Sequence, residues 1–578
     1  MKWGTALGSA LVMTLTASSA VADGNRDGWF DHPYQGFAPS TTVLRDATPA
    51  DAGLDPAPID AALAAVDGWT QPKGTAKPLY AGAVTLLAHD GKVVARTATG
   101  KALKYTVDSA GSGAVELPAD QQIAMRTDTI FDMASVSKLF TSIVVMQQVE
   151  AGRVDLDAPV ASYVPEFGEN GKGAITIRQA LTHTTGLPAW LPLWSAQPDP
   201  ESRLRMALTA ALQNPPGSKY LYSDLNLIAL GEVAHRATGK TLDQLVAEGI
   251  TEPLGMTDTG YNPDPAKRDR IAATEFQVSP PRGMVWGSVH DENAWSLNGV
   301  AGHAGVFSTA GDMATLAQAL LNGGSYRKHR ILNEDSVEQM ITNLNVAFPG
   351  NDHGLGFELN QRWYMAGLSG PRTAGHTGYT GTSIVIDFDS RSFAILLTNR
   401  VHPSRSWGSN NPARRAVAQG LAQALGVDPQ HGADAWFTGT TDSTTSTLTT
   451  AVGVPATGAR LGFDLFVDTE ETDLLYLESS PDGVTWTKLP FEVRDRGTAT
   501  PTDGTYAGTH GRRWVQASAM LAPGPQQLRW RLVTDPLYLG RGVYVDGVRV
   551  VADDDRMLLD REQTPEAFIA VGWRLANR

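Results

Sequence analysis

The sequence predicts an α/β (α+β) domain followed by an all-β sandwich, and three observations support this division. Residues 51–426 mix helical and strand patterns, and the turn Asp90-Gly91 between two apolar stretches is typical of an antiparallel hairpin. From about residue 427, threonine, glycine and aspartate become more frequent, and short alternating stretches such as 461–465 and 528–532 replace helical patterns. A chain of 578 residues is long enough for both domains.

The N-terminus has the pattern of a secretory signal peptide. Lys2 precedes a mostly apolar stretch, 3–15, and Ala20-Val21-Ala22 offers small residues for cleavage. We therefore predict a signal peptide over 1–22 and a secreted protein, the alternative being an ordinary buried helix. Residues 23–50 are rich in Asp, Gly, Pro and aromatic residues without periodicity, which predicts an extended arm. No later stretch is long and apolar enough to span a membrane.

The composition excludes several functions. With 42% hydrophobic and 19% charged residues, the chain can form a large core. A formal net charge of −14 disfavours nucleic acid as a partner. The absence of cysteine excludes thiol catalysis, disulfides and thiolate zinc sites.

The remaining elements of the first domain follow in order. Apolar residues at helical spacing predict a helix that begins near Pro56. The stretches 83–87 and 93–96 predict the two strands of the hairpin, and 383–387 and 393–397 predict two further strands.

The segment 131–138 carries a serine and a lysine three residues apart. The apolar run 139–146 predicts a buried helix after it, and on a helix Ser135 and Lys138 share a face. A serine hydroxyl is a poor nucleophile until a base takes its proton, and a lysine of lowered pKa can be that base. A helix start also aims free N–H groups at negative charge beside Ser135. Alone, the pattern also fits an N-cap serine and a solvated lysine.

Two later motifs join this pair in order. Tyr222-Ser223-Asp224 precedes a helical pattern, and His376-Thr377-Gly378 precedes two predicted strands. A second segment, Gly302-His303-Ala304-Gly305, looks much like the last motif but precedes a helix. We assign the third motif to His376 and interpret His303 as structural. His183 is also interpreted as structural, because nothing near it in the sequence is a nucleophile.

With these three motifs the chain resembles the serine β-lactamase and penicillin-binding-protein superfamily, in its class C β-lactamase, DD-carboxypeptidase and esterase branch. The resemblance covers roughly residues 50–425 and includes 181–187, 253–259 and 397–400. It implies a β-lactamase-like domain over 51–426, with an antiparallel sheet flanked by helices and an all-α subdomain.

The resemblance also implies roles for the motif residues. Ser135 would attack a carbonyl and form an acyl-enzyme, while Lys138 takes its proton or keeps the local field positive. Tyr222 would relay the proton to the leaving group. The backbone N–H groups of Ser135 and Tyr379 would form the oxyanion hole.

Asp224, His376, Thr377 and Gly378 are the predicted substrate-binding residues. A histidine at 376 would make the positive field there depend on pH, as a lysine would not. Asp224 stands where β-lactamases commonly have asparagine, and a carboxylate cannot donate an amide hydrogen bond to the acyl chain. This disfavours efficient β-lactam hydrolysis.

The segment 289–294, with Gly299 to Gly305, resembles a subgroup that includes penicillin-binding protein 4B and a muramoyl-alanine amidase of the same fold. His290, Asp291 and Glu292 are adjacent, so they cannot easily all bind one ion, and a polar loop that lines or braces the cleft is the better interpretation. We expect no metal and no cofactor at the site.

Residues 433–552 resemble the jelly-roll domain of immune-inhibitor-A-type metallopeptidases and MAM-like modules, after a linker at 427–432. Residues 553–578 are predicted to be a C-terminal tail. Such modules bind carbohydrate or protein, or stabilise their neighbour. Carboxylates in this region could hold a calcium ion or form a solvated acidic rim, the interpretation we favour; they are Glu470, Asp473, Asp535 and Asp546.

Taken together, the sequence predicts a secreted serine hydrolase that acts through an acyl-enzyme on peptidoglycan-derived peptides, as a DD-carboxypeptidase or muropeptide amidase. An esterase for small acyl esters or a β-lactamase would use the same residues. A sensor that binds cell-wall fragments or a β-lactam without turnover is the alternative of another class.

Overall fold

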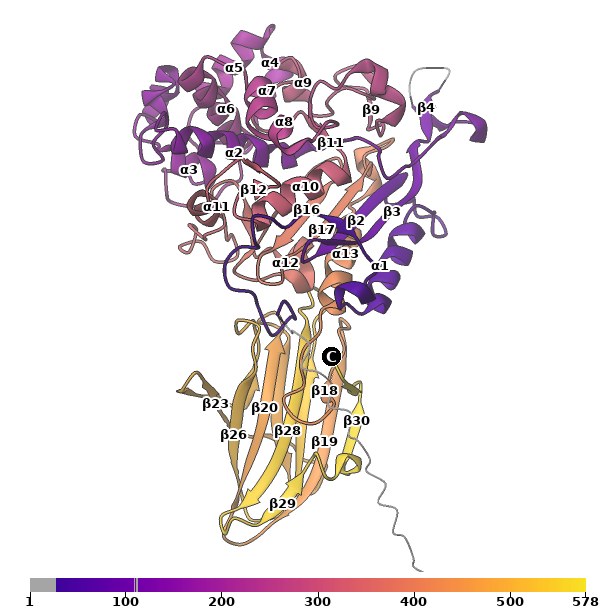
Figure 1. Ribbon diagram of the computed structural model, residues 1–578, viewed down its shortest axis with the longest axis vertical. Helices are drawn as coiled ribbons and strands as arrows, with labels where there is room; N and C mark the ends of the chain where they lie inside the picture. Colours follow the sequence, from indigo (N-terminus) through magenta and orange to yellow (C-terminus); the bar gives the residue numbers. More distant parts are fainter. Residues whose placement is uncertain (1–26, 109, 111–112) are drawn as a thin grey trace, which may run out of the picture.

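The computed structural model consists of an α/β domain and an all-β domain that meet end to end (Figure 1). It describes residues 27–108, 110 and 113–578. The predicted signal peptide at 1–22 lies outside the described residues. Within the described part of the chain, no helix has the length and apolar character needed to cross a lipid bilayer.

The α/β domain is built on one sheet with the strand order β1-β3-β2-β17-β16-β15-β14, antiparallel except for the pair β1–β3. The predicted hairpin is present as β2 and β3, and Asp90 and Gly91 both have positive φ, as the two-residue turn requires. The sheet therefore joins strands from both ends of the domain. Its strands are β1 (Arg45–Asp46), β2 (Gly82–His89), β3 (Lys92–Leu103), β14 (Glu358–Leu359), β15 (Thr373–Thr377), β16 (Ser383–Asp387) and β17 (Ser392–Thr398), and β6 (Ile123–Ala124) pairs with β3.

Helices cover both faces of this sheet. Alternate residues of β2 point to opposite faces, so Leu86 packs in the core beside α2 (Ser137–Glu150) and α10 (Ala310–Leu321). Leu87 packs in a second core with α1 (Pro56–Gly68) and α13 (Asn411–Ala424). With both faces covered, β2 is buried along its whole length.

A helical region lies beyond α2 and contains α6 (Asp224–Thr238), which packs against α2 (Figure 1). The other helices are α3 (Ile177–Leu181), α4 (Leu193–Ala196), α5 (Pro200–Leu208), α7 (Leu242–Val246), α8 (Glu252–Leu254), α9 (Glu292–Ser296), α11 (Glu334–Met340) and α12 (Arg362–Met365). The short strands are β4 (Tyr105–Val107), β5 (Ala114–Glu116), β7 (Phe131–Asp132), β8 (Gly260–Tyr261), β9 (Phe276–Gln277), β10 (Gly283–Met284), β11 (Val306–Ser308), β12 (Ser325–Tyr326) and β13 (His329–Arg330).

The all-β domain has two antiparallel sheets around a core of its own. One sheet has the order β24-β23-β26-β20-β28-β18-β31 with β29 beside β28, and the other has the order β22-β21-β27-β19-β30 with β25 beside β21. The strands are β18 (Ala435–Phe437), β19 (Thr445–Val454), β20 (Ala459–Asp468), β21 (Leu474–Ser480), β22 (Thr487–Lys488), β23 (Glu492–Asp495), β24 (Thr498–Pro501), β25 (Thr505–Tyr506), β26 (Val515–Leu521), β27 (Gly524–Val533), β28 (Gly542–Ala552), β29 (Met557–Asp560), β30 (Phe568–Val571) and β31 (Arg574–Ala576).

The prediction of a C-terminal tail at 553–578 is wrong. These residues supply β29, β30 and β31, which pair with β28, β19 and β18. Leu559 and Phe568 are buried in the sandwich core. The three strands are short and separated by charged turns, so their alternation is hard to recognise in the sequence.

The arm that includes Phe30 and Asp31 contacts both domains. Phe30 is buried in a core that the two domains share, and its N–H donates to the carbonyl of Gly426. The carboxylate of Asp31 accepts from Trp514 Nε1 of the all-β domain, and burial raises the pKa of this carboxyl to about 6. The buried Arg512–Asp387 ion pair, at 2.6 Å, links the domains directly. Removal of one partner of such a pair leaves an uncompensated buried charge, so the interface holds the domains together.

Candidate active site

Ser135 lies in a 3-10 turn, Ala134–Val136, that leads directly into α2. Ala134 has φ of +47°, a left-handed conformation that costs energy for a residue with a side chain. The buried carboxylate of Asp132 holds this turn, because it accepts from the N–H of Ala134 at 2.8 Å and from that of His290 at 2.5 Å. The strained turn presents the Ser135 side chain to a cavity.

Lys138 is buried, and its ammonium group contacts three sides of the site. Nζ lies 2.8 Å from Ser135 Oγ, 2.8 Å from Asp224 Oδ1 and 3.2 Å from the carbonyl oxygen of His303. Burial alone would lower the pKa of Lys138, but the Asp224 carboxylate and the Tyr222 hydroxyl outweigh it and raise the pKa above its ordinary value. Two roles were expected for Lys138: accepting the Ser135 proton or keeping the local field positive. Because Lys138 is protonated in the free enzyme, the second role is favoured.

Tyr222 contacts both Ser135 and Lys138, and the Lys138 ammonium lies 4.7 Å from the centre of its ring. Burial raises the pKa of Tyr222 to about 12, while its hydrogen bonds to Lys138 and Ser135 oppose this rise. The next residue, Ser223, caps α6, because its hydroxyl accepts from the N–H of Leu225. This cap fixes the start of the helix, so Tyr222 precedes it and Asp224 opens it beside Lys138.

His183 supports this segment without facing the substrate side. Its Nδ1 accepts from the N–H of Ser223 at 3.1 Å, and its ring lies 4.6 Å from that of Tyr222. Burial lowers the pKa of His183 well below its ordinary value, so the ring is neutral. These contacts fit the structural role expected for it.

The third motif lies at the end of β15 and is tied to the backbone that precedes Ser135. The hydroxyl of Thr380 donates to the carbonyl of Asp132 at 2.7 Å, and that of Thr382 donates to Met133 at 3.0 Å. A Cβ at Gly378 would lie 2.4 Å from the carbonyl oxygen of Met133, so only glycine fits there. This close approach brings Tyr379, which follows, to the cavity that Ser135 lines.

The expectation that His376 carries a pH-dependent positive charge is wrong. Burial and the nearby Lys138 lower the pKa of His376 to about 3, so the imidazole is neutral at ordinary pH. Its Nδ1 donates to the carbonyl of Thr377 at 2.8 Å, and its Nε2 is buried without a hydrogen-bond partner. Sequence alone does not reveal the depth at which this histidine is buried.

All the predicted site residues lie around one cavity of about 360 Å³ except Lys138 and Asp224, which lie behind Ser135 and Tyr222. The cavity is also lined by residues that the sequence motifs did not identify. Two of them are cationic, Arg400 and Arg414, and Arg414 donates to the carbonyl of Gly378 at 2.7 Å. Glu358 is a third, and burial raises its pKa to about 7. Glu358 lies on a two-residue strand without a recognisable pattern, whereas Arg400 ends the quoted segment 397–400.

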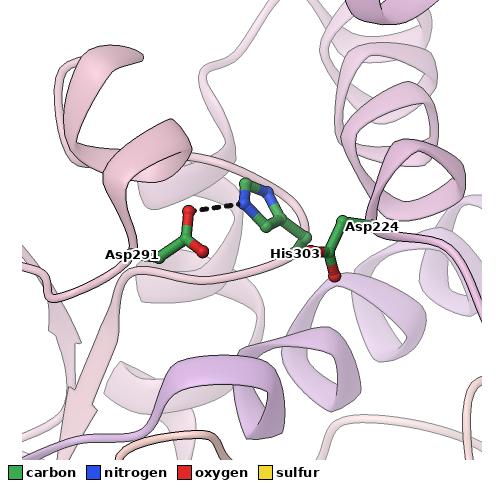
Figure 2. A group of neighbouring side chains, drawn as sticks. All are labelled: Asp224, Asp291 and His303. Carbon is green, nitrogen blue, oxygen red and sulfur yellow. Dashed lines mark hydrogen bonds and ion pairs between the residues drawn. The ribbon is translucent and has the colours of Figure 1, made fainter. Parts of the chain in front are cut away.

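The polar loop near His290 braces the site through two networks. His303 Nε2 lies 2.9 Å from Asp291 Oδ1, and Figure 2 shows Asp224 on the other side of the same imidazole. Ligand atoms of these three residues lie within 4.8 Å of one another. Lys138 already pairs with Asp224, and a second cation would be repelled there. His290 pairs separately with Glu275 at 2.9 Å.

The four carboxylates that could hold a calcium ion, although we favour a solvated acidic rim, are not all brought together. Glu470, Asp473 and Asp535 cluster within 4.8 Å, whereas Asp546 accepts from the backbone of His431 and pairs with Arg561. Mutual repulsion and burial raise the pKa of Glu470 to about 7, with burial the larger cause.

Comparison with known proteins agrees with this geometry. Residues 73–419 match the family model described as Beta-lactamase. The "Putative D-alanyl-D-alanine carboxypeptidase" of Escherichia coli (strain K12) is 32% identical over 403 residues, which cover 64% of this chain and 88% of the relative. A protein of the same name from Salmonella typhimurium is 32% identical over 408 residues, which cover 63% of this chain and 88% of the relative.

Two solved structures are similar to this chain at low identity. The hydrolase EstCE1, described as having promiscuous acyltransferase activity, gives a TM-score of 0.49 at 22% identity over 63% of this chain and 99% of its own. A penicillin-binding protein homologue from Caulobacter crescentus gives 0.48 at 23% identity over 63% and 97%. Neither likeness bears on activity. The family model spans more than half of the chain and includes Ser135, Tyr222 and His376, and the protein therefore belongs to the beta-lactamase family of serine hydrolases.

Proposed function

We propose that the protein is a secreted hydrolase that removes the last residue of peptides ending in D-alanyl-D-alanine, through an acyl-enzyme on Ser135. One observation carries the proposal: the Ser135 hydroxyl contacts both the Lys138 ammonium and the Tyr222 phenol at the wall of a cavity. The printed name of the relatives at 32% identity supports this choice of substrate. The signal-peptide pattern at 1–22 supports secretion.

The protonation states of the site favour a concerted proton relay. Neither Lys138 nor Tyr222 is deprotonated in the free enzyme, because the pKa of each is raised. As Ser135 Oγ bonds to the carbonyl carbon, its proton passes to Tyr222 Oη, and the phenol gives its own proton to the leaving nitrogen. The carbon–nitrogen bond breaks and the terminal residue leaves as a free amine. Water then reverses the relay and releases the acid. Lys138 stabilises the negative charge that develops on the phenol oxygen.

The substrate carboxylate needs a cation that His376 does not supply. Arg400 and Arg414 line the cavity, and Thr377 adds a hydroxyl beside them. A guanidinium stays charged over the whole working range of pH and binds a carboxylate with two donors. Both arginines donate to two backbone carbonyls, Arg400 to Arg405 and Gly408 and Arg414 to Gly378 and Thr382, but Arg414 is buried whereas Arg400 is partly exposed. We therefore propose that Arg400 and Thr377 receive the terminal carboxylate.

The test measures D-alanine released from an acylated peptide that ends in D-alanyl-D-alanine. We expect steady release by the wild type and a loss of at least about a thousandfold in Ser135→Ala, because the nucleophile is removed. Ser162→Ala changes an exposed serine and serves as the matched control. Turnover of nitrophenyl esters without peptide cleavage would make the protein an esterase. A Ser135 adduct that never turns over, seen by mass spectrometry, would make it a sensor.

We also propose a jelly-roll topology for the all-β domain. Its first four strands, β18 to β21, alternate between the two sheets, and β26, β27 and β28 do the same. Alternation of this kind supports the resemblance that the sequence indicated.

A further inference from the structure

The outer face of the larger sheet in the all-β domain carries a polar groove, on strands β20, β23, β26 and β28, which lie side by side in the lower part of Figure 1. Exposure alternates along β20 and β26, so every second side chain points to solvent. Gly462 lies at the middle of this outer face, opposite Ser518 on one side and Arg549 on the other. Because glycine has no side chain, the sheet surface is hollow at this point.

Three arginines surround the hollow. Arg460, Arg494 and Arg549 line a cavity of about 370 Å³ together with Gly462, Ser518 and Asp464, and the Asp464 carboxylate pairs with His431 at 2.7 Å. Arg494 contacts Glu492 at 3.2 Å and Arg549 contacts Asp560 at 3.6 Å, but exposed ion pairs contribute little and exchange readily. The guanidinium groups therefore remain available to a ligand, although the chain as a whole has a net charge of −14.

The groove is elongated rather than round. A second cavity, of about 620 Å³, adjoins the first and shares Arg460, Arg494 and Ser518 with it. The two together cross strands β20, β26 and β23, so the hollow has room for several units of a linear chain. A small anion would leave most of it empty.

The chemistry of the walls favours a charged ligand over a neutral sugar. Neutral sugars are commonly held on exposed aromatic rings, whereas the rings that border these cavities, Phe463 and Phe491, are each only 4% exposed and belong to the core. An arginine fork instead matches a carboxylate with two parallel hydrogen bonds. The hydroxyl of Ser518 and the amide of Gln516 supply further polar groups for sugar hydroxyls.

We propose that this groove binds a linear acidic carbohydrate, one whose repeating units carry carboxylates. The site lies in the all-β domain, and the proposal does not depend on the reaction at Ser135. Binding there would hold the catalytic domain close to an acidic polymer.

The test titrates full-length protein with oligogalacturonic acid by calorimetry at low salt. The same oligosaccharide with its carboxyl groups reduced to alcohols serves as the neutral probe. We expect binding of the acidic probe alone, weakened as salt is raised, because counterions compete for the guanidinium groups. Arg460→Gln combined with Arg494→Gln should weaken binding by about a hundredfold, since two charge-assisted contacts are lost.

Two further variants keep the test decisive. Gly462→Leu fills the hollow without a clash, because a Cβ there meets nothing within 4 Å, and it should abolish binding. Arg556→Gln removes an exposed arginine of the same domain outside the groove and should bind like the wild type. The circular dichroism spectrum and the urea unfolding midpoint should stay unchanged in every variant, which shows that each is folded. Equal affinity for both probes, absence of binding, or wild-type affinity in Gly462→Leu would each overturn the proposal.

Discussion

Two Gly-His-x-Gly segments lie at the site, and they contribute opposite backbone groups. Segment 302–305 directs the carbonyl of His303 at Lys138 Nζ, 3.2 Å away. Segment 375–378 leads to Tyr379, whose N–H we assign to the oxyanion hole. Their rings differ in the nitrogen that is bonded: His303 pairs with Asp291 through Nε2 and its Nδ1 is buried without a partner, whereas His376 donates from Nδ1 to the carbonyl of Thr377 and its Nε2 is buried without a partner.

The difference arises from the element that each segment joins. His376 is the second-last residue of β15, and the turn that follows this strand is fixed to the backbone before Ser135 by Thr380 and Thr382. His303 precedes the short strand β11, whose Val306 N–H donates to the hydroxyl of Ser137 on α2. Similar local sequences therefore take different roles because tertiary context decides which backbone group faces the site.

The largest effect is expected from removing the backbone N–H of Tyr379, which follows segment 375–378. Tyr379→Pro removes the N–H at this position, and we expect kcat/KM to fall by about 10² to 10³, as for the loss of one oxyanion-hole donor. Tyr379→Ala keeps the N–H and removes only a side chain that is 49% exposed, so kcat/KM should change less than about threefold. Steady-state kinetics on peptide and ester substrates measure both, with circular dichroism to check the fold. Equal losses in the two variants would remove Tyr379 from the oxyanion hole.

Much of the fold could be predicted from local patterns. The hairpin around Asp90-Gly91, the helix at Pro56 and the all-β character beyond 427 depend on short-range periodicity and turn chemistry. The strands of 553–578 could not be predicted, because each is only three or four residues long and depends on pairing with strands far away in the sequence.

The sequence predicted most of the site residues but not their protonation states. Spacing predicted the proximity of Ser135 and Lys138, which the structure places 2.8 Å apart. Protonation depends on burial and on partners from distant segments, so the raised pKa of Lys138 and the lowered pKa of His376 could not be predicted from motifs. Glu358 was missed for the same reason, because only the folded chain brings it to the cavity.

A double-mutant cycle tests the contact between the His303 ring and the Asp291 carboxylate. Asp291→Ala should lower the free energy of unfolding by about 2 to 3 kcal/mol, because it leaves the buried His303 Nε2 unpaired, and His303→Ala by about 1 to 2 kcal/mol, because Asp291 is partly exposed and still accepts from the N–H of Ala294. Together they should cost less than the sum, with a coupling of about 1 to 3 kcal/mol, as for residues in contact. His376→Ala combined with Asp291→Ala should instead be additive within about 0.5 kcal/mol. Urea unfolding of the single and double variants measures these free energies. A coupling between His376 and Asp291 would mean that the rings of His303 and His376 belong to one network.

The smallest effect is expected on the pH dependence of stability, through the protonation of His376. Burial lowers the pKa of His376 to about 3. Below about pH 6.5 the unfolded chain therefore binds a proton at this residue that the folded chain does not bind, so the free energy of unfolding falls as pH falls. His183 and His353 add to this slope, since burial lowers their pKa values too. His376→Gln should reduce the slope between pH 6 and pH 4 by up to about 1.4 kcal/mol per pH unit, whereas the exposed His329→Gln should not. Urea unfolding at several pH values measures this. An unchanged slope in His376→Gln would mean that the folded ring takes up a proton and joins Lys138 in the positive field, which would make His376 a cation in the catalytic cavity.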